Sequence, residues 1–296
     1  MSTVSRREFI KASLAGAAVL HLPKLSGKTE LVQSHQDWMG PVPLGKSGVS
    51  VSRVAMGSGV DGWRYNSNLK RLGAESFLDL LLYNYERGIT FVDTADIYGT
   101  HENIKEIWAH IPRENIQIMT KVWTKPNNWA TIYKPDEVVE QFRKELGTDY
   151  IDIVLIHSQT SSNWLVETKA IRNALSEAKE KGLIGALGVS CHSWEAMLAA
   201  SESDWVEVIL SRINNNGARL DNDPEKVMQL LKKMHDQGKG VIGMKIFGGG
   251  QTTSEQERES SLRFVLKSGV VDAISLGMEK KVYVDDALSR IQNILQ

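Results

Sequence analysis

Apolar positions follow two alternating patterns from about residue 40 to the end of the chain. Short runs rich in Val, Ile and Leu, bounded by polar turns, predict strands. Longer stretches with apolar residues on a 3.6-residue repeat predict helices. The predicted strands cover residues 54–58, 89–94, 116–122, 151–157, 184–190, 206–213, 240–247 and 270–276. The predicted helices cover residues 74–87, 101–110, 135–146, 167–181, 194–201, 224–237, 255–267 and 284–295.

This order of elements predicts the fold. Because strand and helix alternate strictly, the strands are expected to be parallel. Eight strand–helix units over about 250 residues fit a closed barrel better than an open doubly wound sheet. We therefore predict an α/β fold, a single (β/α)8 TIM barrel over residues 41–296. Residues 44–52, which include Gly45 and Gly48, are expected to form a short N-terminal hairpin that closes the barrel floor.

The N-terminal segment has a different pattern. Ser5-Arg6-Arg7-Glu8-Phe9-Ile10-Lys11 precedes an apolar run over residues 12–22, which Pro23 ends. The run is shorter than the roughly 20 residues of a membrane-spanning helix, so no stable membrane span is expected. The segment resembles a twin-arginine export signal. We therefore expect residues 1–35 to be a leader that engages the twin-arginine export machinery.

The leader determines the expected location of the protein. We expect an exported, periplasmic protein, with the leader either cleaved or kept as an anchor. If the leader is not functional, the protein is cytoplasmic. The alternative interpretation of the segment is an amphipathic arm with a chance arginine pair.

Composition excludes several classes of protein. The 296 residues carry 35 Lys and Arg against 36 Asp and Glu, a net charge of −1. This balance gives no electrostatic reason to expect a nucleic-acid partner. Cys191 is the single cysteine, so an intrachain disulfide and a cysteine-based zinc or iron–sulfur site are excluded.

Four titratable residues fall at predicted strand ends or just after them. Asp93, Lys121 and His157 end three neighbouring strands, and Tyr98 follows the first of these. Active sites of (β/α)8 barrels lie at the carboxyl ends of the strands, so we expect these side chains to converge. A neighbouring lysine lowers the pKa of a tyrosine, and a carboxylate holds the lysine in place. Such a set suits proton delivery to a carbonyl oxygen, while hydride comes from a cofactor.

These residues also carry a resemblance to a known family. The segment Asp93-Thr94-Ala95-Asp96-Ile97-Tyr98-Gly99, with Lys121 and His157, resembles the signature and the Asp/Tyr/Lys/His tetrad of the aldo-keto reductases. Further similar segments are Leu44–Gly48, Gly57–Gly59 and Gly188–Ser190, and the resemblance covers residues 41–296. It implies a TIM barrel that binds NADPH or NADH and transfers hydride between nicotinamide and a carbonyl or alcohol substrate. It also implies Tyr98 as general acid/base, Asp93 and Lys121 as groups that tune it, and His157 as the group that orients the carbonyl.

The resemblance implies a set of cofactor contacts as well. These are Gly57, Ser58, Ser190, Cys191, Asn214, Phe247, Gly248, Gly249, Gly277, Lys280, Lys281 and Asp286. The chain departs from the family pattern at Cys191, Leu210, Ile213 and Tyr283, so the preference between NADPH and NADH stays open. Trp63, Trp123 and Trp129 fall in predicted rim loops and are expected to line the substrate pocket.

Two other functions remain possible from the sequence. A sensor could bind the same cofactor without turnover, because fold alone does not determine function. A metal-dependent hydrolase could use His101, His157, His192 and Asp96. No His-x-His pair ends a predicted strand, so we expect no metal site.

Overall fold

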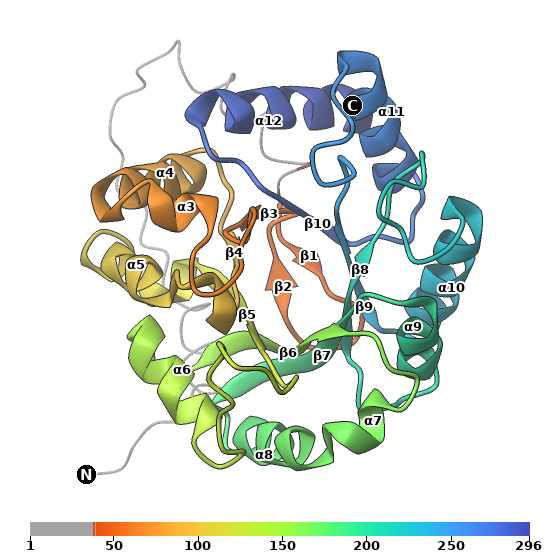
Figure 1. Cartoon of the computed structure of the whole chain (residues 1–296). Coiled ribbons are helices and arrows are strands. Elements are labelled where there is room, and N and C mark those ends of the chain that lie inside the picture. Colours follow the sequence, from red (N-terminus) through yellow and green to blue (C-terminus); the bar gives the residue numbers. More distant parts are fainter. Residues whose placement is uncertain (1–37, 39) are drawn as a thin grey trace, which may run out of the picture. The chain divides into compact units, whose positions relative to one another are not determined.

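The computed structural model describes Trp38 and residues 40–296 (Figure 1). The leader that the sequence predicts over residues 1–35 lies outside this described part. Within the described part, no helix has both the length and the apolar character needed to cross a membrane.

The centre of the fold is a closed barrel of parallel strands (Figure 1). Its strands are β3 (Val54–Gly57), β4 (Phe91–Asp93), β5 (Gln117–Val122), β6 (Ile151–Gln159), β7 (Ile184–Cys191), β8 (Val208–Arg212), β9 (Gly240–Met244) and β10 (Ala273–Leu276). Neighbours in sequence are neighbours in space, and β10 pairs with β3 to close the ring. The predicted (β/α)8 barrel is therefore confirmed.

Helices surround the barrel (Figure 1). They are α3 (Asn68–Arg71), α4 (Ala74–Glu86), α5 (His101–Lys105), α6 (Val138–Leu146), α7 (Trp164–Glu167), α8 (Lys169–Glu180), α9 (Trp194–Ser201), α10 (Pro224–Asp236), α11 (Glu255–Leu266) and α12 (Lys281–Leu295). The helix predicted over 101–110 is divided, because after α5 the chain continues as a 3-10 helix, η2 (Glu106–Ala109). The segment predicted over 167–181 likewise divides between the end of α7 and α8.

Local sequence explains where several helices begin and end. Ser254 and Glu257 form a reciprocal capping box at the start of α11, which satisfies backbone N–H groups that a helix end leaves free. The C-cap of α6 is Gly147, with φ of 61°, a left-handed conformation that favours glycine. The predicted start of α11 and the predicted end of α6 agree with the structure, whereas α6 begins at Val138, three residues after its predicted start.

A hairpin closes the amino-terminal end of the barrel. Its strands β1 (Val42–Pro43) and β2 (Ser50–Val51) pair antiparallel. Leu44 is fully buried within the cluster of side chains inside the barrel. The neighbouring Gly45 has φ of 51°, and a Cβ there would lie 2.3 Å from the Gly238 carbonyl oxygen, so only glycine fits. The predicted floor hairpin is present, and the opposite end carries the four residues that the sequence predicts as catalytic.

Two apolar layers hold the barrel together. One fills its interior and includes Phe91, Met119 and Leu155. The other lies between strands and helices and includes Phe77 and the fully buried Trp164. This division follows from strand geometry, in which successive side chains point to opposite faces. Both faces of the strands are buried and mostly apolar, so the polar residues at the strand ends are exceptions to the pattern.

Candidate active site

The structure brings the four sequence-predicted catalytic residues together at the carboxyl ends of neighbouring strands. Asp93 is the last residue of β4, while Lys121 and His157 lie toward the ends of β5 and β6. Tyr98 ends a short 3-10 helix, η1 (Asp96–Tyr98), just after β4. Asp93, Lys121 and His157 are all less than a tenth exposed. Buried ionisable groups of this kind are typical of functional sites.

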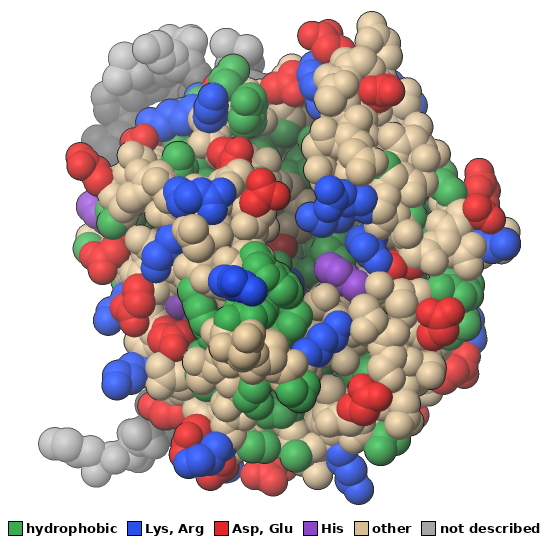
Figure 2. Space-filling model, viewed as in Figure 1, with side chains coloured by type: hydrophobic (Ala, Val, Ile, Leu, Met, Phe, Trp, Pro, Cys, Tyr) green, Lys and Arg blue, Asp and Glu red, His purple; other side chains and the backbone are tan. Residues whose placement is uncertain are grey.

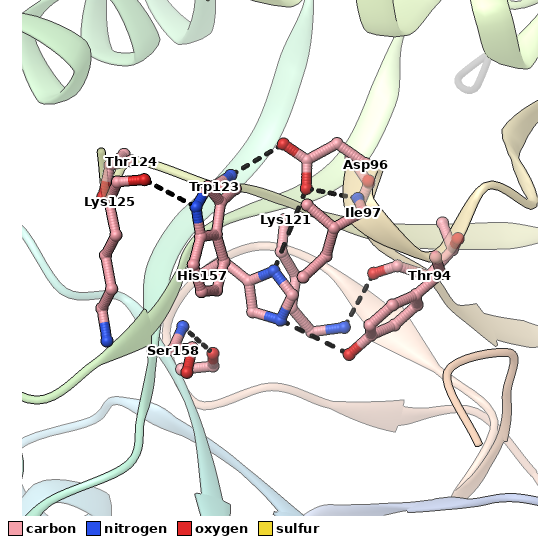
Figure 3. A network of polar contacts seen from close by, with 12 residues as sticks. Thr94, Asp96, Ile97, Lys121, Trp123, Thr124, Lys125, His157 and Ser158 are labelled. Atoms are coloured by element: carbon pink, nitrogen blue, oxygen red, sulfur yellow. Dashed lines mark hydrogen bonds and ion pairs between the residues drawn. The ribbon is translucent and has the colours of Figure 1, made fainter. Parts of the chain in front are cut away.

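Asp93 and Lys121 form a buried ion pair at the base of the site. The Lys121 ammonium also donates to the Thr94 carbonyl at 2.7 Å (Figure 3). The other carboxylate oxygen of Asp93 accepts a hydrogen bond from the Ser275 hydroxyl. Sequence reasoning missed Ser275, although it lies in the strand predicted over 270–276. Both charges are thus satisfied within the protein, which burial requires.

Lys121 also lies beside the phenol. Its Nζ is 4.9 Å from the centroid of the Tyr98 ring. Burial raises the pKa of Tyr98, and the nearby Lys121 lowers it by less, so the net pKa is raised. The sequence led us to expect a lowered pKa, because desolvation cannot be read from a motif. Burial lowers the pKa of Lys121, but Asp93 and Tyr98 raise it by more, so the ammonium stays charged.

His157 faces the tyrosine hydroxyl. The distance between the Tyr98 hydroxyl oxygen and His157 Nε2 is 3.4 Å. Burial lowers the pKa of His157 well below its usual range, and Lys121 lowers it further. The ring is therefore neutral near pH 7, with one nitrogen as donor and the other as acceptor. Tyr98 thus has a charged group on one side and a neutral hydrogen-bonding group on the other.

A second buried carboxyl group, Asp96, lies behind His157 (Figure 3). One oxygen accepts the backbone N–H of Ile97 and the other accepts that of Trp123, each at 2.7 Å. The first oxygen is 3.9 Å from His157 Nδ1. Sequence reasoning considered Asp96 only as a possible metal ligand. Its position two residues before Tyr98 was the available signal for a role beside the tetrad.

Glycines allow the Tyr98 ring to pack closely against the loop after β3. A Cβ at Gly59 would lie 2.3 Å from Tyr98 Cε2, and one at Gly62 would lie 2.7 Å from Cδ1. Real Cβ atoms do not approach other atoms this closely. The loop therefore holds the phenol in place only because both side chains are absent.

Three tryptophans from the rim loops form one cluster, Trp63, Trp123 and Trp129. Their ring centroids are 4.5 to 5.7 Å apart. Trp123 also meets the His157 ring edge to face at 5.7 Å. Figure 2 shows hydrophobic side chains gathered beside a hollow on this face, with Lys and Arg side chains around it. The tryptophan cluster therefore lies next to the tetrad, as a substrate wall would.

Some of the predicted cofactor residues lie at the same end of the barrel. Ser190 is buried, and its hydroxyl accepts the backbone N–H of Ser158 at 2.7 Å. Its neighbour Cys191 is also buried, which raises the thiol pKa. Asn214 has a buried side-chain oxygen without a hydrogen-bond partner in the described chain. Gly248 and Gly249 both have left-handed φ values in the loop after β9.

The predicted residues near β3 and β10 are closely packed. A Cβ at Gly57 would lie 2.9 Å from the Ser275 hydroxyl, and one at Gly277 would lie 2.2 Å from Val60. The Ser58 hydroxyl is 3.1 Å from that of Thr100, inside the protein. Close packing therefore explains why small residues occupy these three positions.

The remaining predicted cofactor residues lie in α12, at its N-cap, and in the segment after β9. Lys280 is the N-cap of α12, and Lys281 binds Asp79 of α4 at 2.9 Å. The single Nε–H of Arg290 lies 3.0 Å from both carboxylate oxygens of Asp286, so the two side chains form an ion pair. Phe247 packs against the layer between strands and helices.

Two further cations at the barrel opening were missed by sequence reasoning. Lys245 follows β9 with φ of 58°, and its ammonium has no partner in the part of the chain that is described. Burial lowers the pKa of Lys245, and the nearby Arg219 lowers it further. The Arg219 side chain lies 3.0 Å from where a Gly249 Cβ would be. The position of Lys245 within the strand predicted over 240–247 was the available signal.

The structure also locates two departures from the family pattern. Leu210 belongs to the cluster inside the barrel, so it faces the interior. Ile213 belongs to the layer between strands and helices, where it lies against Gly243. Ile213 therefore does not face the barrel opening, and at this level Met244 packs against the interior cluster instead.

The residues proposed for a hydrolase have other partners. His101 uses both ring nitrogens, with Glu145 at 2.7 Å and Thr120 at 2.8 Å. Burial, with a smaller contribution from Arg212, lowers the pKa of His192 to about 2. Across Trp38 and residues 40–296, no three His, Cys, Asp or Glu side chains are arranged to hold a metal ion.

Fold and site together place the chain among the (β/α)8-barrel enzymes, and comparison with known proteins identifies the family. The model of the Aldo/keto reductase family matches residues 55–294. The chain belongs to this family, whose members are oxidoreductases that use NADPH or NADH.

Individual relatives show how far the similarity extends. An NADH-specific methylglyoxal reductase of Escherichia coli is 28% identical over 258 residues, covering 77% of this chain and 78% of that protein. A probable aldo-keto reductase 1 of Glycine max is 31% identical over 160 residues, or 51% of this chain, but the match spans less than half, 44%, of its length. A solved structure from Pseudomonas aeruginosa, described as an aldo-keto reductase, has a TM-score of 0.71 with 23% identity, covering 89% of this chain and 99% of that one. The last likeness shows the shared fold.

Proposed function

We propose that the protein transfers hydride between a nicotinamide cofactor and a small aldehyde or ketone, or the corresponding alcohol, with Tyr98 as general acid/base. The observation that carries this proposal is the place of the Tyr98 hydroxyl, 3.4 Å from His157 Nε2, with the Lys121 ammonium 4.9 Å from its ring. A charged Lys121 stabilises the phenolate that remains after proton transfer. His157 provides a hydrogen-bonding atom beside the same hydroxyl, which suits the orientation of a substrate oxygen.

The residues at the barrel opening fit a nicotinamide dinucleotide. The free buried oxygen of Asn214 suits a carboxamide N–H, and Ser190 lies one strand away. Lys245 and Arg219 supply positive charge for phosphate groups, and Gly248 and Gly249 leave backbone space beside them. When bound, the cofactor supplies the hydride, which no side chain can provide.

The phenol hydroxyl provides the test of this function. Tyr98→Phe removes the acid and little else, so turnover of methylglyoxal should fall by about 10²- to 10⁴-fold. Nicotinamide absorbance measures turnover, and fluorescence titration should show nearly unchanged nucleotide binding. Tyr83→Phe is the matched control, because it removes a phenol oxygen that binds Asp285 on the protein surface. Unchanged turnover in Tyr98→Phe would refute the assignment, and nucleotide binding without turnover in the wild type would favour the sensor.

Titration with NADPH and NADH tests the nucleotide preference. The E. coli relative is named as NADH-specific. The family resemblance places Tyr283 where aldo-keto reductases carry an arginine that contacts the 2′-phosphate of NADPH, so we propose that NADH binds at least as tightly as NADPH. Mass spectrometry of the denatured, purified protein identifies any nucleotide that it retains. At least tenfold tighter binding of NADPH would contradict this preference.

We also infer that residues 1–35 direct export through the twin-arginine machinery to the periplasm. The support is the sequence Ser5 to Lys11 with its arginine pair. Replacing Arg6 and Arg7 with lysine keeps the charge but removes the pair, so the protein should accumulate in the cytoplasm. Cell fractionation measures this, with Lys11→Arg as the control. Normal export of the double-lysine variant would contradict the inference.

A further inference from the structure

The two ring nitrogens of His157 have different surroundings. Nδ1 is buried and makes no hydrogen bond within the described chain. A buried polar atom without a hydrogen-bond partner lowers the stability of the folded protein. The nearby polar group is the Asp96 carboxyl, whose oxygen lies 3.9 Å away (Figure 3). That distance is too long for a direct hydrogen bond and short enough for a strong electrostatic influence in a buried site.

We propose that Asp96 is a positioning residue that determines which ring nitrogen of His157 carries the proton, an inference that rests on the reductase function proposed above. An ionised Asp96 attracts the N–H to Nδ1, so that Nε2 presents a lone pair toward Tyr98. A neutral Asp96 removes this attraction. The proton then resides on Nε2, the ordinary preference of a free imidazole, and Nε2 can donate to a carbonyl oxygen.

The proton count changes on only one residue in this scheme. When the pH rises, Asp96 releases its proton to solvent. His157 remains neutral, and its single proton moves from Nε2 to Nδ1. No bond between heavy atoms forms or breaks, and the positive charge of Lys121 is unchanged.

Asp96 is held firmly enough for this role. Its side chain is 1% exposed, and both oxygens are fixed by the backbone N–H groups of Ile97 and Trp123. Burial raises its pKa to about 7, although these hydrogen bonds and the nearby His101 lower it. Both protonation states are therefore accessible near neutral pH without movement of the carboxyl group.

The other ionisable groups around Asp96 do not account for such a change. From α6, Glu145 raises the pKa of Asp96, while from α5, His101 lowers it. Burial raises the pKa of Glu145, but hydrogen bonds from His101 and Gln141 lower it by more, so Glu145 is ionised at neutral pH. On the tetrad side, the pKa values of Tyr98 and Lys121 are both raised, which takes them further from neutrality.

His157 is also faced by charges from other strands. Lys121 lowers the pKa of His157, Asp93 raises it, and Lys125 lowers it. Lys125 follows β5, and burial lowers its own pKa from the usual lysine value. None of these changes places the titration of His157 itself near pH 7, because burial is the largest influence and keeps the ring neutral.

The scheme gives the reaction a preference for protonated Asp96. Reduction requires Nε2–H to hold the carbonyl oxygen, so it is favoured when Asp96 is protonated. Oxidation passes through the same transition state, in which Nε2–H holds the substrate oxygen while the single hydroxyl proton of the alcohol goes to Tyr98, so it requires the same tautomer. In reduction, kcat/KM should fall about tenfold per pH unit above the pKa of Asp96, as for loss of one proton.

Nitrogen NMR of the ¹⁵N-histidine-labelled full chain observes the tautomer directly. The His157 signals are identified by their loss in His157→Gln. Below about pH 7 the protonated nitrogen should be Nε2, and above it Nδ1. Asp96→Asn should abolish the change, while Asp61→Asn, an exposed carboxylate on the loop after β3, should not. A single His157 tautomer in the wild type across this range would overturn the inference, whether or not the variants fold.

Kinetics separates this role from a structural one. Asp96→Asn should remove the decline of kcat/KM above neutral pH. In a His157→Gln background the same substitution should leave the pH profile unchanged, because Asp96 acts through His157; a further change of the profile there would contradict the inference. If the wild type turns over substrate while His157 keeps one tautomer at every pH, only this inference is refuted and the proposed function stands. If the His157 tautomer changes with pH but the wild type does not turn over substrate, the proposed function is refuted. The role of Asp96 in placing the His157 proton is then still supported.

Discussion

The buried ion pair between Asp93 and Lys121 gives a sharp stability prediction. Asp93→Asn keeps the side-chain shape but leaves the Lys121 ammonium, which is 1% exposed, without its counter-charge. Removing one member of a buried pair costs about 3–5 kcal/mol. Lys121 retains the Thr94 carbonyl at 2.7 Å, which favours the lower end of that range. Since each kcal/mol changes the melting temperature of a chain this long by about 2–4 °C, we expect a fall of at least about 6 °C.

The loss of stability in Asp93→Asn should depend on pH in a definite direction. Burial lowers the pKa of Lys121, and Asp93 is among the groups that raise it. Without Asp93 we expect the effect of burial to exceed that of Tyr98, so the folded-state pKa should fall below the unfolded value of about 10.4 and the unfolded state should bind more protons. The stability of Asp93→Asn relative to the wild type should therefore increase as the pH rises toward that value.

Urea denaturation, followed by circular dichroism, measures the difference in unfolding free energy. The control is the double variant Asp93→Asn/Lys121→Met, in which both charges are absent and most of the stability should return. A single variant within about 1 kcal/mol of the wild type would refute the view that Lys121 depends on Asp93. A double variant as unstable as the sum of the single variants would refute it as well.

Three other predictions follow from the packing and the pKa values. Gly59→Ala should displace the Tyr98 ring, because its Cβ would lie 2.3 Å from Cε2, and should lower kcat at least tenfold with near-normal thermal stability. Trp164→Ala should lower the unfolding free energy by about 3–5 kcal/mol in urea, because the indole is fully buried and its N–H binds the Ala196 carbonyl. The pKa of Asp96 is raised to about 7 in the folded state, so its contribution to stability is complete below the unfolded value of about 4 and is lost as the pH rises through 7. The difference in unfolding free energy between wild type and Asp96→Asn should therefore change with pH mainly in that window.

The barrel and its tetrad were predictable because each depends on local signals. Continuous apolar runs such as residues 151–157 predict strands buried on both faces, and parallel strands place their carboxyl ends on one edge. Asp93, Lys121 and His157 each end such a run, so their convergence follows from topology alone. No distance information was needed to bring them together.

The details that depend on long-range contacts were not predictable. The hydroxyl of Ser275 reaches Asp93 across 182 residues of sequence, and no motif marks that pair. The raised pKa of Tyr98 results from burial by loops whose conformation has no simple pattern. The inward or outward direction of Ile213 likewise depends on where β8 ends, and one residue of difference changes the face on which a side chain lies.

The pairing of β3 with β10 has a consequence for biosynthesis. Ile274 lies opposite Val54, so the ring closes between strands separated by about 220 residues. A nascent chain that lacks β10 would have unpaired backbone groups along both β3 and β9, and open strand edges promote association with other chains. Closure must therefore wait until nearly the whole polypeptide has been synthesised. Until then the unfinished protein is expected to depend on chaperones more than a protein whose domains fold one after another.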